Sequence, residues 1–83
     1  MTEVVLYSKR VCHLCDLASE ILADLAHGTQ ITWRRVDIET DPALFDRFQY
    51  EVPVIEIVGG AVLKWPTTRE RVRRAIVDCS TNP

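Results

Sequence analysis

The sequence lacks the features of several large protein classes. No apolar run among its 83 residues approaches the roughly 20 residues that a membrane-spanning helix needs. Ten basic and twelve acidic residues give a formal net charge of −2, so no excess of positive charge indicates nucleic-acid binding. Internal repeats, low-complexity tracts and linkers are also missing. We therefore expect residues 1–83 to form a single domain.

Cysteine is scarce and odd in number, with only Cys12, Cys15 and Cys79. Two of the three are three positions apart, so they do not form the disulfide framework of a small secreted domain. The segment Met1-Thr2-Glu3 carries an acid where a secretory signal would carry bases, and the apolar stretch that follows is only four residues long. These observations predict a cytoplasmic protein without a membrane partner.

Hydrophobic periodicity predicts an α/β fold with the order β-α-β-α-β-β-α. A strand, a long helix and a second strand fit a right-handed parallel crossover, and Gly59-Gly60, both with positive φ, would turn an antiparallel hairpin. The simplest packing is one four-stranded mixed sheet with helices on both faces. The expected elements cover residues 3–8, 12–26, 30–38, 42–50, 54–58, 61–64 and the segment after 67. The first helix has one expected apolar stripe, formed by Leu14, Leu17, Ala18, Ile21, Leu22 and Leu25.

Capping residues predict where the two later helices begin. Asp41 is a good N-cap and Pro42 a good first helical residue. Thr67 and Glu70 match a capping box, which predicts Thr67 as the N-cap of the last helix. Glu56 is the one misfit, because a charge in a central strand is costly if buried, so we expect it near an open end of the sheet.

The pair Cys12 and Cys15 is the strongest functional signal. It follows an apolar strand and opens the first helix, where unpaired N–H groups and the helix dipole stabilise a thiolate. Thiols of this motif reach a pKa of roughly 3.5 to 7, against about 8.5 for a free thiol. Cys12 is the expected nucleophile toward a disulfide and Cys15 the resolving thiol. Lys9 and Arg10 add positive charge nearby, and His13 is either a tuner of the pair or an exposed bystander.

Val52-Pro53 is the second element of the expected site. An X-Pro bond adopts the cis form at modest cost, and a cis bond here would leave the carbonyl and N–H of Val52 open. Both groups could then pair with the backbone of a substrate. Leu14, between the cysteines, would add an apolar lip against which a partner packs.

The run Tyr7–Cys15, the later Val52-Pro53 and the element order resemble the glutaredoxin-like proteins of the thioredoxin fold, in particular the small bacterial type with a C-x-L-C site. The resemblance covers essentially the whole chain. It implies a thiol–disulfide oxidoreductase with a redox-active disulfide and a role in electron transport, in which Cys12 attacks and Cys15 resolves. It also implies that Val52-Pro53 is a cis-proline bond beside the thiols and that Lys9 contacts the carboxylate of glutathione. Trp65 lies where the family binds thiol ligands, so it is a candidate wall of the site, although packing is the more common role of a tryptophan.

Three departures from the family pattern bear on the substrate. His13 and Leu14 replace the usual Pro and aromatic, Glu51 replaces a Thr and would repel an anionic tripeptide, and Lys64-Trp65-Pro66 replaces a Gly-Gly and an acid. The resemblance therefore supports dithiol chemistry better than it supports glutathione. We expect a monomer without a bound cofactor that reduces protein or low-molecular-weight mixed disulfides. Glutathione or another small thiol would be the co-substrate, or a reductase the electron donor.

The alternative is a non-enzymatic thioredoxin-fold module that binds a metal centre, an iron–sulfur centre or a protein partner. A structural zinc site usually has four ligands, and beyond the cysteine pair only Cys79, His13 and His27 remain, without paired spacing. No metal ligand is therefore predicted within the chain. Cys79 continues the apolar stripe of Val72 and Ile76, which favours a packing role over a third redox thiol.

Overall fold

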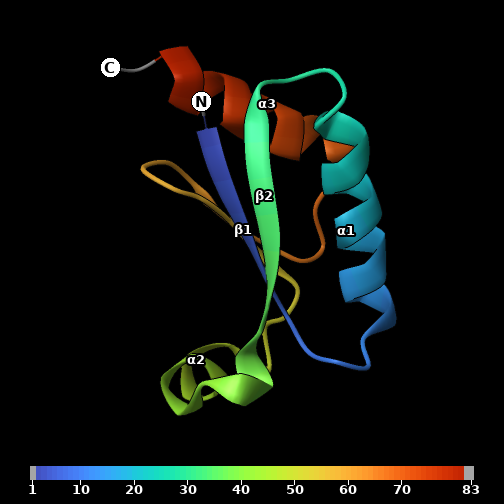
Figure 1. Ribbon diagram of the computed structural model, residues 1–83, viewed down its shortest axis with the longest axis vertical. Helices are drawn as coiled ribbons and strands as arrows, with labels where there is room; N and C mark the ends of the chain where they lie inside the picture. The colour runs from blue at the N-terminus through green and yellow to red at the C-terminus, as the bar shows by residue number, and fades with distance from the viewer. Residues whose placement is uncertain (1, 82–83) are drawn as a thin grey trace.

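The fold is built on a sheet packed against helices (Figure 1), and the computed structural model describes residues 2–81. The strands are β1 (Thr2–Ser8), β2 (Ile31–Asp37), β3 (Val54–Ile57) and β4 (Val62–Lys64). The helices are α1 (His13–Leu25), the short 3-10 helix η1 (Ile38–Thr40), α2 (Pro42–Phe48) and α3 (Arg69–Thr81). Within the described range, no helix is both long and apolar enough to cross a membrane.

The sheet has four strands in the order β2-β1-β3-β4. Strand β1 is parallel to β2 and antiparallel to β3, and β3 is antiparallel to β4. This arrangement confirms the predicted mixed sheet and the predicted order of elements. Strand β2 lies at one edge of the sheet, as its mixed polar pattern indicated.

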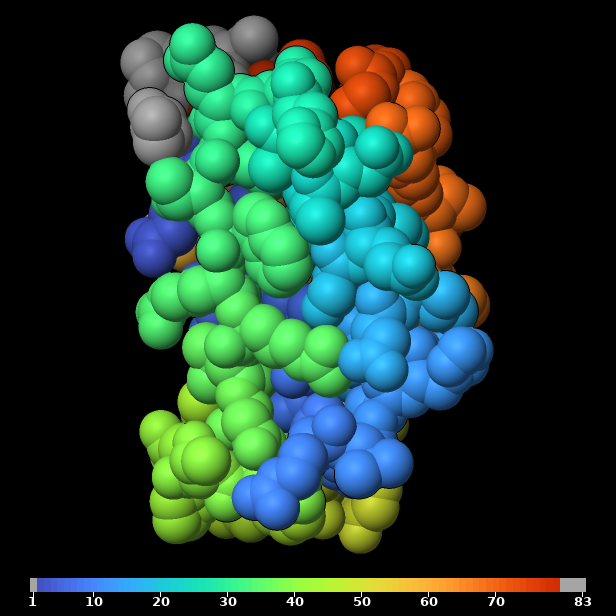
Figure 2. All heavy atoms as spheres, turned by 45° about the vertical axis from the view of Figure 1, so that its right-hand side comes forward, coloured from blue at the N-terminus to red at the C-terminus, as the bar shows by residue number. Residues whose placement is uncertain are grey.

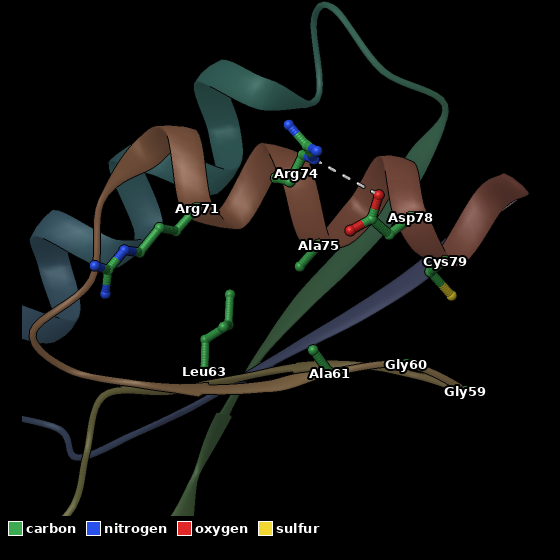
Figure 3. Close-up of a pocket in the computed structure, with 9 residues that line it drawn as sticks. All are labelled: Gly59, Gly60, Ala61, Leu63, Arg71, Arg74, Ala75, Asp78 and Cys79. Atoms are coloured by element: carbon green, nitrogen blue, oxygen red, sulfur yellow. Dashed lines mark ion pairs between the residues drawn. The ribbon is translucent and has the colours of Figure 1, made fainter. Parts of the chain in front are cut away.

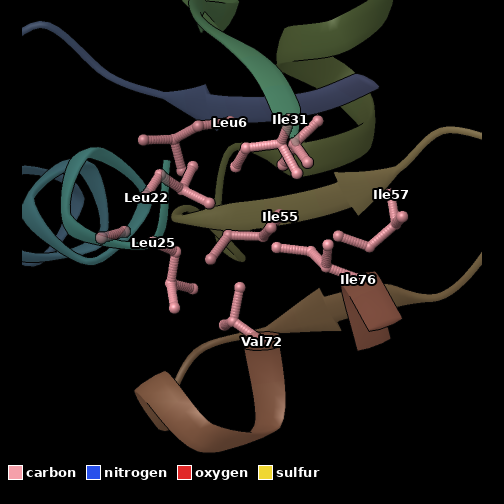
Figure 4. Close-up of a cluster of buried hydrophobic side chains, with 10 residues drawn as sticks. Leu6, Leu22, Leu25, Ile31, Ile55, Ile57, Val72 and Ile76 are labelled. Atoms are coloured by element: carbon pink, nitrogen blue, oxygen red, sulfur yellow. The ribbon is translucent and has the colours of Figure 1, made fainter. Parts of the chain in front are cut away.

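Helices α1 and α3 cover one face of the sheet and enclose the main core (Figure 4). Successive side chains of a strand point to opposite faces, so Val4 and Leu6 of β1 and Ile55 and Ile57 of β3 share this face. All four are at most 1% exposed. Each such side chain stabilises the fold by about 1.5–3 kcal/mol relative to the exposed state.

Helix α2 packs on the opposite face, at one end of the sheet. Phe48 forms a second core cluster with Ile38 and Val54, and its ring stacks on Tyr7 with centroids 4.8 Å apart. Asp41 is the N-cap of α2 as predicted, since its carboxylate accepts hydrogen bonds from two N–H groups of the first turn at 2.9 and 3.4 Å. The prediction of helices on both faces is therefore confirmed.

The apolar stripe of α1 is wider than the face that the helix buries. Its buried residues are Cys15, Ala18, Leu22 and Leu25. Leu14 and Leu17 remain 43% and 36% exposed, and Ile21 is half-buried. These three residues follow one another at i, i+3 and i+7 along the edge of the stripe that turns away from the sheet. The expected stripe is therefore divided into a buried face and a more exposed edge, and Leu14 is exposed as expected of an apolar lip.

The predicted capping box of α3 is also wrong. The helix begins at Arg69, so Thr68 precedes it, and the Thr68 hydroxyl accepts a hydrogen bond from the Arg71 N–H at 3.2 Å. Glu70 instead bonds the Arg73 guanidinium at 2.5 and 3.0 Å, which lowers the pKa of that carboxyl. The Thr67 hydroxyl oxygen is buried without a hydrogen-bond partner among the described residues. Either threonine could cap the helix by its residue type, and Thr68 is the cap because the helix begins at Arg69.

The β3–β4 hairpin differs from expectation in its second glycine. Gly59 has a φ of 82°, but Gly60 does not take a positive φ. A Cβ on Gly60 would lie 3.2 Å from the sulfur of Cys79, so close packing against α3 explains this glycine. Glu56 does not lie at an open end of the sheet. It is half-buried in an inner strand, and its carboxylate accepts a hydrogen bond from the Tyr7 hydroxyl at 2.7 Å.

Candidate functional site

The two cysteines lie at the junction between β1 and α1, Cys12 directly before the helix and Cys15 in its first turn. Cys12 is the N-cap of α1, with extended φ and ψ of −155° and 103°, and its sulfur accepts a hydrogen bond from the Cys15 N–H at 3.1 Å. Cys15 lies one turn inside the helix and is fully buried, whereas Cys12 is half-buried. The two sulfurs form a disulfide across a Cα–Cα distance of 5.1 Å. The accessible sulfur is therefore the one at the end of the helix, where unpaired N–H groups favour negative charge.

The pairing of the strands gathers three segments at one end of the sheet. Val54 at the start of β3 pairs with Tyr7 near the end of β1 and with Lys64 at the end of β4. The segments next to these strand ends carry Cys12, the pair Val52-Pro53, and Trp65. The structure thus brings the predicted site residues to the same end of the sheet, although they are up to 53 positions apart in sequence.

The peptide bond between Val52 and Pro53 is cis, and Pro53 is buried. The Val52 N–H is not open, because it donates a hydrogen bond to the Phe48 carbonyl at the end of α2, at 3.2 Å. The expectation that both backbone groups of Val52 face open space was therefore wrong for the N–H. A segment that follows directly on a helix is close to the unpaired carbonyls of its last turn, and Val52 satisfies one of them. Of the two backbone groups of Val52, it is the N–H that is bonded within the described part of the chain.

The basic residues before the cysteines make contacts within the protein, Lys9 through its side chain and Arg10 through its backbone. Lys9 is half-buried with its ammonium 5.8 Å from the centre of the Phe45 ring. The N–H of Arg10 donates a hydrogen bond to Glu39 at 3.0 Å. A hollow of about 330 Å³ lies beside the loop, and it is lined by Lys9, Arg10, Val11 and Glu39. His13 and Leu14 are exposed at the start of α1.

Glu51 and Trp65 lie on the other side of the cis bond. The carboxylate of Glu51 forms an ion pair of 2.5 Å with Lys64, so the positive charge offsets much of the repulsion that Glu51 alone would exert on an anion. Trp65 is half-buried and packs against the main core, and its bond to Pro66 is also cis. Trp65 therefore packs against the core with one part of its side chain, and the exposed part lines a hollow beside α1.

Arg35 holds the cysteine loop and was missed from the sequence. From β2 its guanidinium donates to the Ser8 hydroxyl at 2.9 Å, the Asp16 carboxylate at 2.9 Å, the Ser19 hydroxyl at 3.1 Å and the Lys9 carbonyl at 3.3 Å. These bonds join β2 to the end of β1 and to the first turns of α1. The available signal was its position, because Arg35 continues the alternation of Ile31 and Trp33 on the helix-covered face.

Cys79 lies far from the disulfide, at the opposite end of β3. It is half-buried with its thiol 3.7 Å from the Val58 carbonyl. It borders a hollow of about 420 Å³ between the hairpin and α3, where Arg74 pairs with Asp78 (Figure 3). This placement supports the packing role predicted for Cys79. Within residues 2–81, no group of three or more His, Cys, Asp or Glu side chains could hold a metal ion.

Comparisons with known proteins agree with this geometry. Two solved structures are similar to the chain, both of the Northeast Structural Genomics target protein XcR50 from X. campestris. The X-ray structure is 35% identical with a TM-score of 0.77 and aligns over 90% of this chain and 96% of its own. The solution structure is 35% identical with a TM-score of 0.75 over 94% and 95%. No curated protein matches. The family model described as Glutaredoxin-like domain (DUF836) matches residues 3–77, and the chain therefore belongs to this glutaredoxin-like family of the thioredoxin fold.

Proposed function

We propose that the protein is a thiol–disulfide oxidoreductase that reduces protein or low-molecular-weight mixed disulfides through Cys12 and Cys15. The observation that carries this proposal is the disulfide between a half-buried N-cap cysteine and a fully buried partner one turn later. The N–H of Cys15 donates a hydrogen bond to the sulfur of Cys12 in the disulfide form, and the same donor would stabilise a Cys12 thiolate after reduction. The accessible sulfur is the attacking one because a substrate cannot reach Cys15.

The reaction balances as one disulfide exchange followed by a second. The Cys12 thiolate attacks one sulfur of the substrate, the substrate S–S bond breaks, and the other substrate sulfur leaves as a thiolate that takes up a proton. Cys15 then loses its proton and attacks the Cys12 sulfur, which closes the internal disulfide and releases the second substrate thiol. Two electrons and two protons pass from the cysteine pair to the substrate. Two molecules of a small thiol such as glutathione, which leave as their disulfide, or a reductase, then return two electrons and two protons and restore the dithiol.

The surrounding residues fit supporting roles in substrate binding. In this proposal, the Val52 carbonyl accepts one hydrogen bond from an extended substrate backbone beside the cis bond to Pro53. His13 and Leu14 flank the accessible sulfur, and Lys9 adds positive charge beside the loop. The ion pair between Glu51 and Lys64 reduces the repulsion that the Glu51 carboxylate would exert on an anionic thiol substrate.

The direct test compares the wild type with Cys12→Ser, Cys15→Ser and Cys79→Ser on a disulfide-bonded peptide. We expect Cys12→Ser to abolish reduction and Cys79→Ser to retain it. We expect Cys15→Ser to accumulate a mixed disulfide between Cys12 and the substrate that mass spectrometry detects. If Cys12→Ser reduces the peptide as fast as the wild type, the proposal is wrong. Purification with stoichiometric metal would instead favour the binding-module alternative.

A further inference from the structure

A groove runs along α1, beside the segment that leads into α3. It has a volume of about 540 Å³, with Leu17 and Ile21 of α1 and Trp65 forming its apolar lining. Charged residues Glu20, Asp24 and Arg69 form its rim. Figure 2 presents the outer face of α1 in blue and cyan, with the orange atoms of the segment around the start of α3 along its edge. We call this feature the α1 groove.

The α1 groove is continuous with the redox pair through an exposed apolar ridge. Leu14 lies between the two cysteines, and Leu17 and Ile21 follow it at helical spacing on the same edge of α1. Val11, directly before Cys12, is 92% exposed. At 1.5 Å per residue, the ridge from Leu14 to Ile21 extends about 10 Å from the disulfide. An apolar side chain of a bound segment could pack on this ridge while its cysteine reacts with Cys12.

The charges on the rim determine what the groove can bind. Asp24 is already paired with Arg69 at 2.6 Å, and Asp16 nearer the disulfide is held by Arg35 at 2.9 Å. Glu20 lies between them on α1 and makes no hydrogen bond or ion pair with the described residues. A partner that covers the groove would therefore gain from an apolar side chain on the lining and a positive charge facing Glu20.

We propose that the α1 groove binds a segment of a disulfide-containing protein substrate in which an apolar residue and an adjacent Lys or Arg follow the reactive cysteine. This inference rests on the proposed function and names its substrate class. The distance of about 10 Å equals roughly three residues of extended chain, so the apolar residue lies about three positions from the cysteine. The basic side chain pairs with Glu20, which selects such segments over small disulfides that are too short to reach the groove.

The test uses a chromophoric 5-thio-2-nitrobenzoate group in mixed disulfide with a peptide of cysteine, two glycines, leucine and lysine. Two further peptides carry serine for the leucine or glutamate for the lysine, and cysteine alone with the same group is the small substrate. The readout is the ratio of kcat/KM for the peptide to that for the small substrate. Leu17→Ser should lower this ratio about tenfold for the leucine peptide. Val77→Ser, at a residue 37% exposed on α3, is the matched control and should leave the ratio unchanged.

Glu20→Lys should reverse the preference between the lysine and glutamate peptides, a result that altered folding of the variant would not produce. Equal ratios for Leu17→Ser and Val77→Ser would overturn the docking inference and leave the proposed function intact. A loss of dimers in Leu17→Ser on size-exclusion chromatography would also overturn it, because the groove would then bind a second copy of the chain. Failure of the wild type to reduce any of these disulfides would overturn both proposals.

Discussion

Replacing Cys12 should separate two roles of this residue, because its sulfur is both the proposed nucleophile and the N-cap of α1. Cys12→Ser keeps an acceptor for the Cys15 N–H, since serine is among the best N-cap residues. Cys12→Ala removes the acceptor. Both variants lack the disulfide, so the contribution of the disulfide cancels from the difference between them.

The size of this difference follows from the cap geometry. The Cys15 N–H lies 3.1 Å from the Cys12 sulfur, and in the alanine variant this N–H loses its partner. Loss of an N-cap side chain costs about 1 kcal/mol. In a domain of 83 residues, this free energy corresponds to a difference of roughly 4–8 °C in Tm.

The assay is thermal unfolding under reducing conditions, followed by circular dichroism. We expect Cys12→Ser to melt above Cys12→Ala, with neither variant reducing a disulfide substrate. Val11→Ser and Val11→Ala form the matched control, because Val11 is 92% exposed and does not cap α1, so these two variants should melt together. Equal Tm values for the two Cys12 variants would refute the assignment of Cys12 as the N-cap.

Three further predictions follow from the polar contacts. Arg35→Leu removes four hydrogen bonds, and the buried Ser8 hydroxyl then keeps only its bond to the Val36 carbonyl at 3.4 Å. Urea unfolding should therefore show a loss of about 1–3 kcal/mol, whereas Arg35→Lys should lose less. The pKa of Tyr7 is raised above 10.0 by its hydrogen bond to a half-buried carboxylate on β3 and by burial. The hydrogen bond of Tyr7 therefore contributes to stability below pH 10, and this contribution is lost as the pH rises through the pKa of the folded state. In a Tyr50→Phe background, Tyr7 is the only tyrosine, and its absorbance titration should have a midpoint above pH 10. A midpoint at or below pH 10 would contradict this prediction. Thr68→Ala should lower the free energy of unfolding in urea by about 1 kcal/mol because it removes the cap of α3. An equal or larger loss for Thr67→Ala would instead support Thr67 as the N-cap.

Local patterns predicted most of the fold. The alternation in the strands, the helical spacing around Ala18 and Leu22, and the Asp41-Pro42 cap act over neighbouring residues, and the structure contains each of the elements that they predict. The position of the cysteine pair at the start of α1 was predictable for the same reason. The family match agrees with these local features along nearly the whole chain.

Long-range contacts determined what the sequence could not show. Arg35 bonds groups that lie 16 to 27 positions away, and no local pattern specifies such a set. The tilt of α1 on the sheet decides that Leu14 and Leu17 are exposed while other apolar residues of the helix are buried. The course of the chain after α2 directs the Val52 N–H back to that helix. Each of these outcomes depends on how elements pack, which a window of neighbouring residues does not encode.

The reactivity proposed for the Cys12 sulfur depends on its place at the start of α1. The most direct measurement is the rate of iodoacetamide alkylation of each cysteine in the reduced protein between pH 5 and 9, resolved by peptide mass spectrometry. We expect Cys12 to react first and to be already fast at neutral pH, while buried Cys15 reacts slowly. A Cys12 that reacts at neutral pH no faster than an ordinary exposed thiol, or a Cys15 or Cys79 that reacts before it, would contradict this expectation.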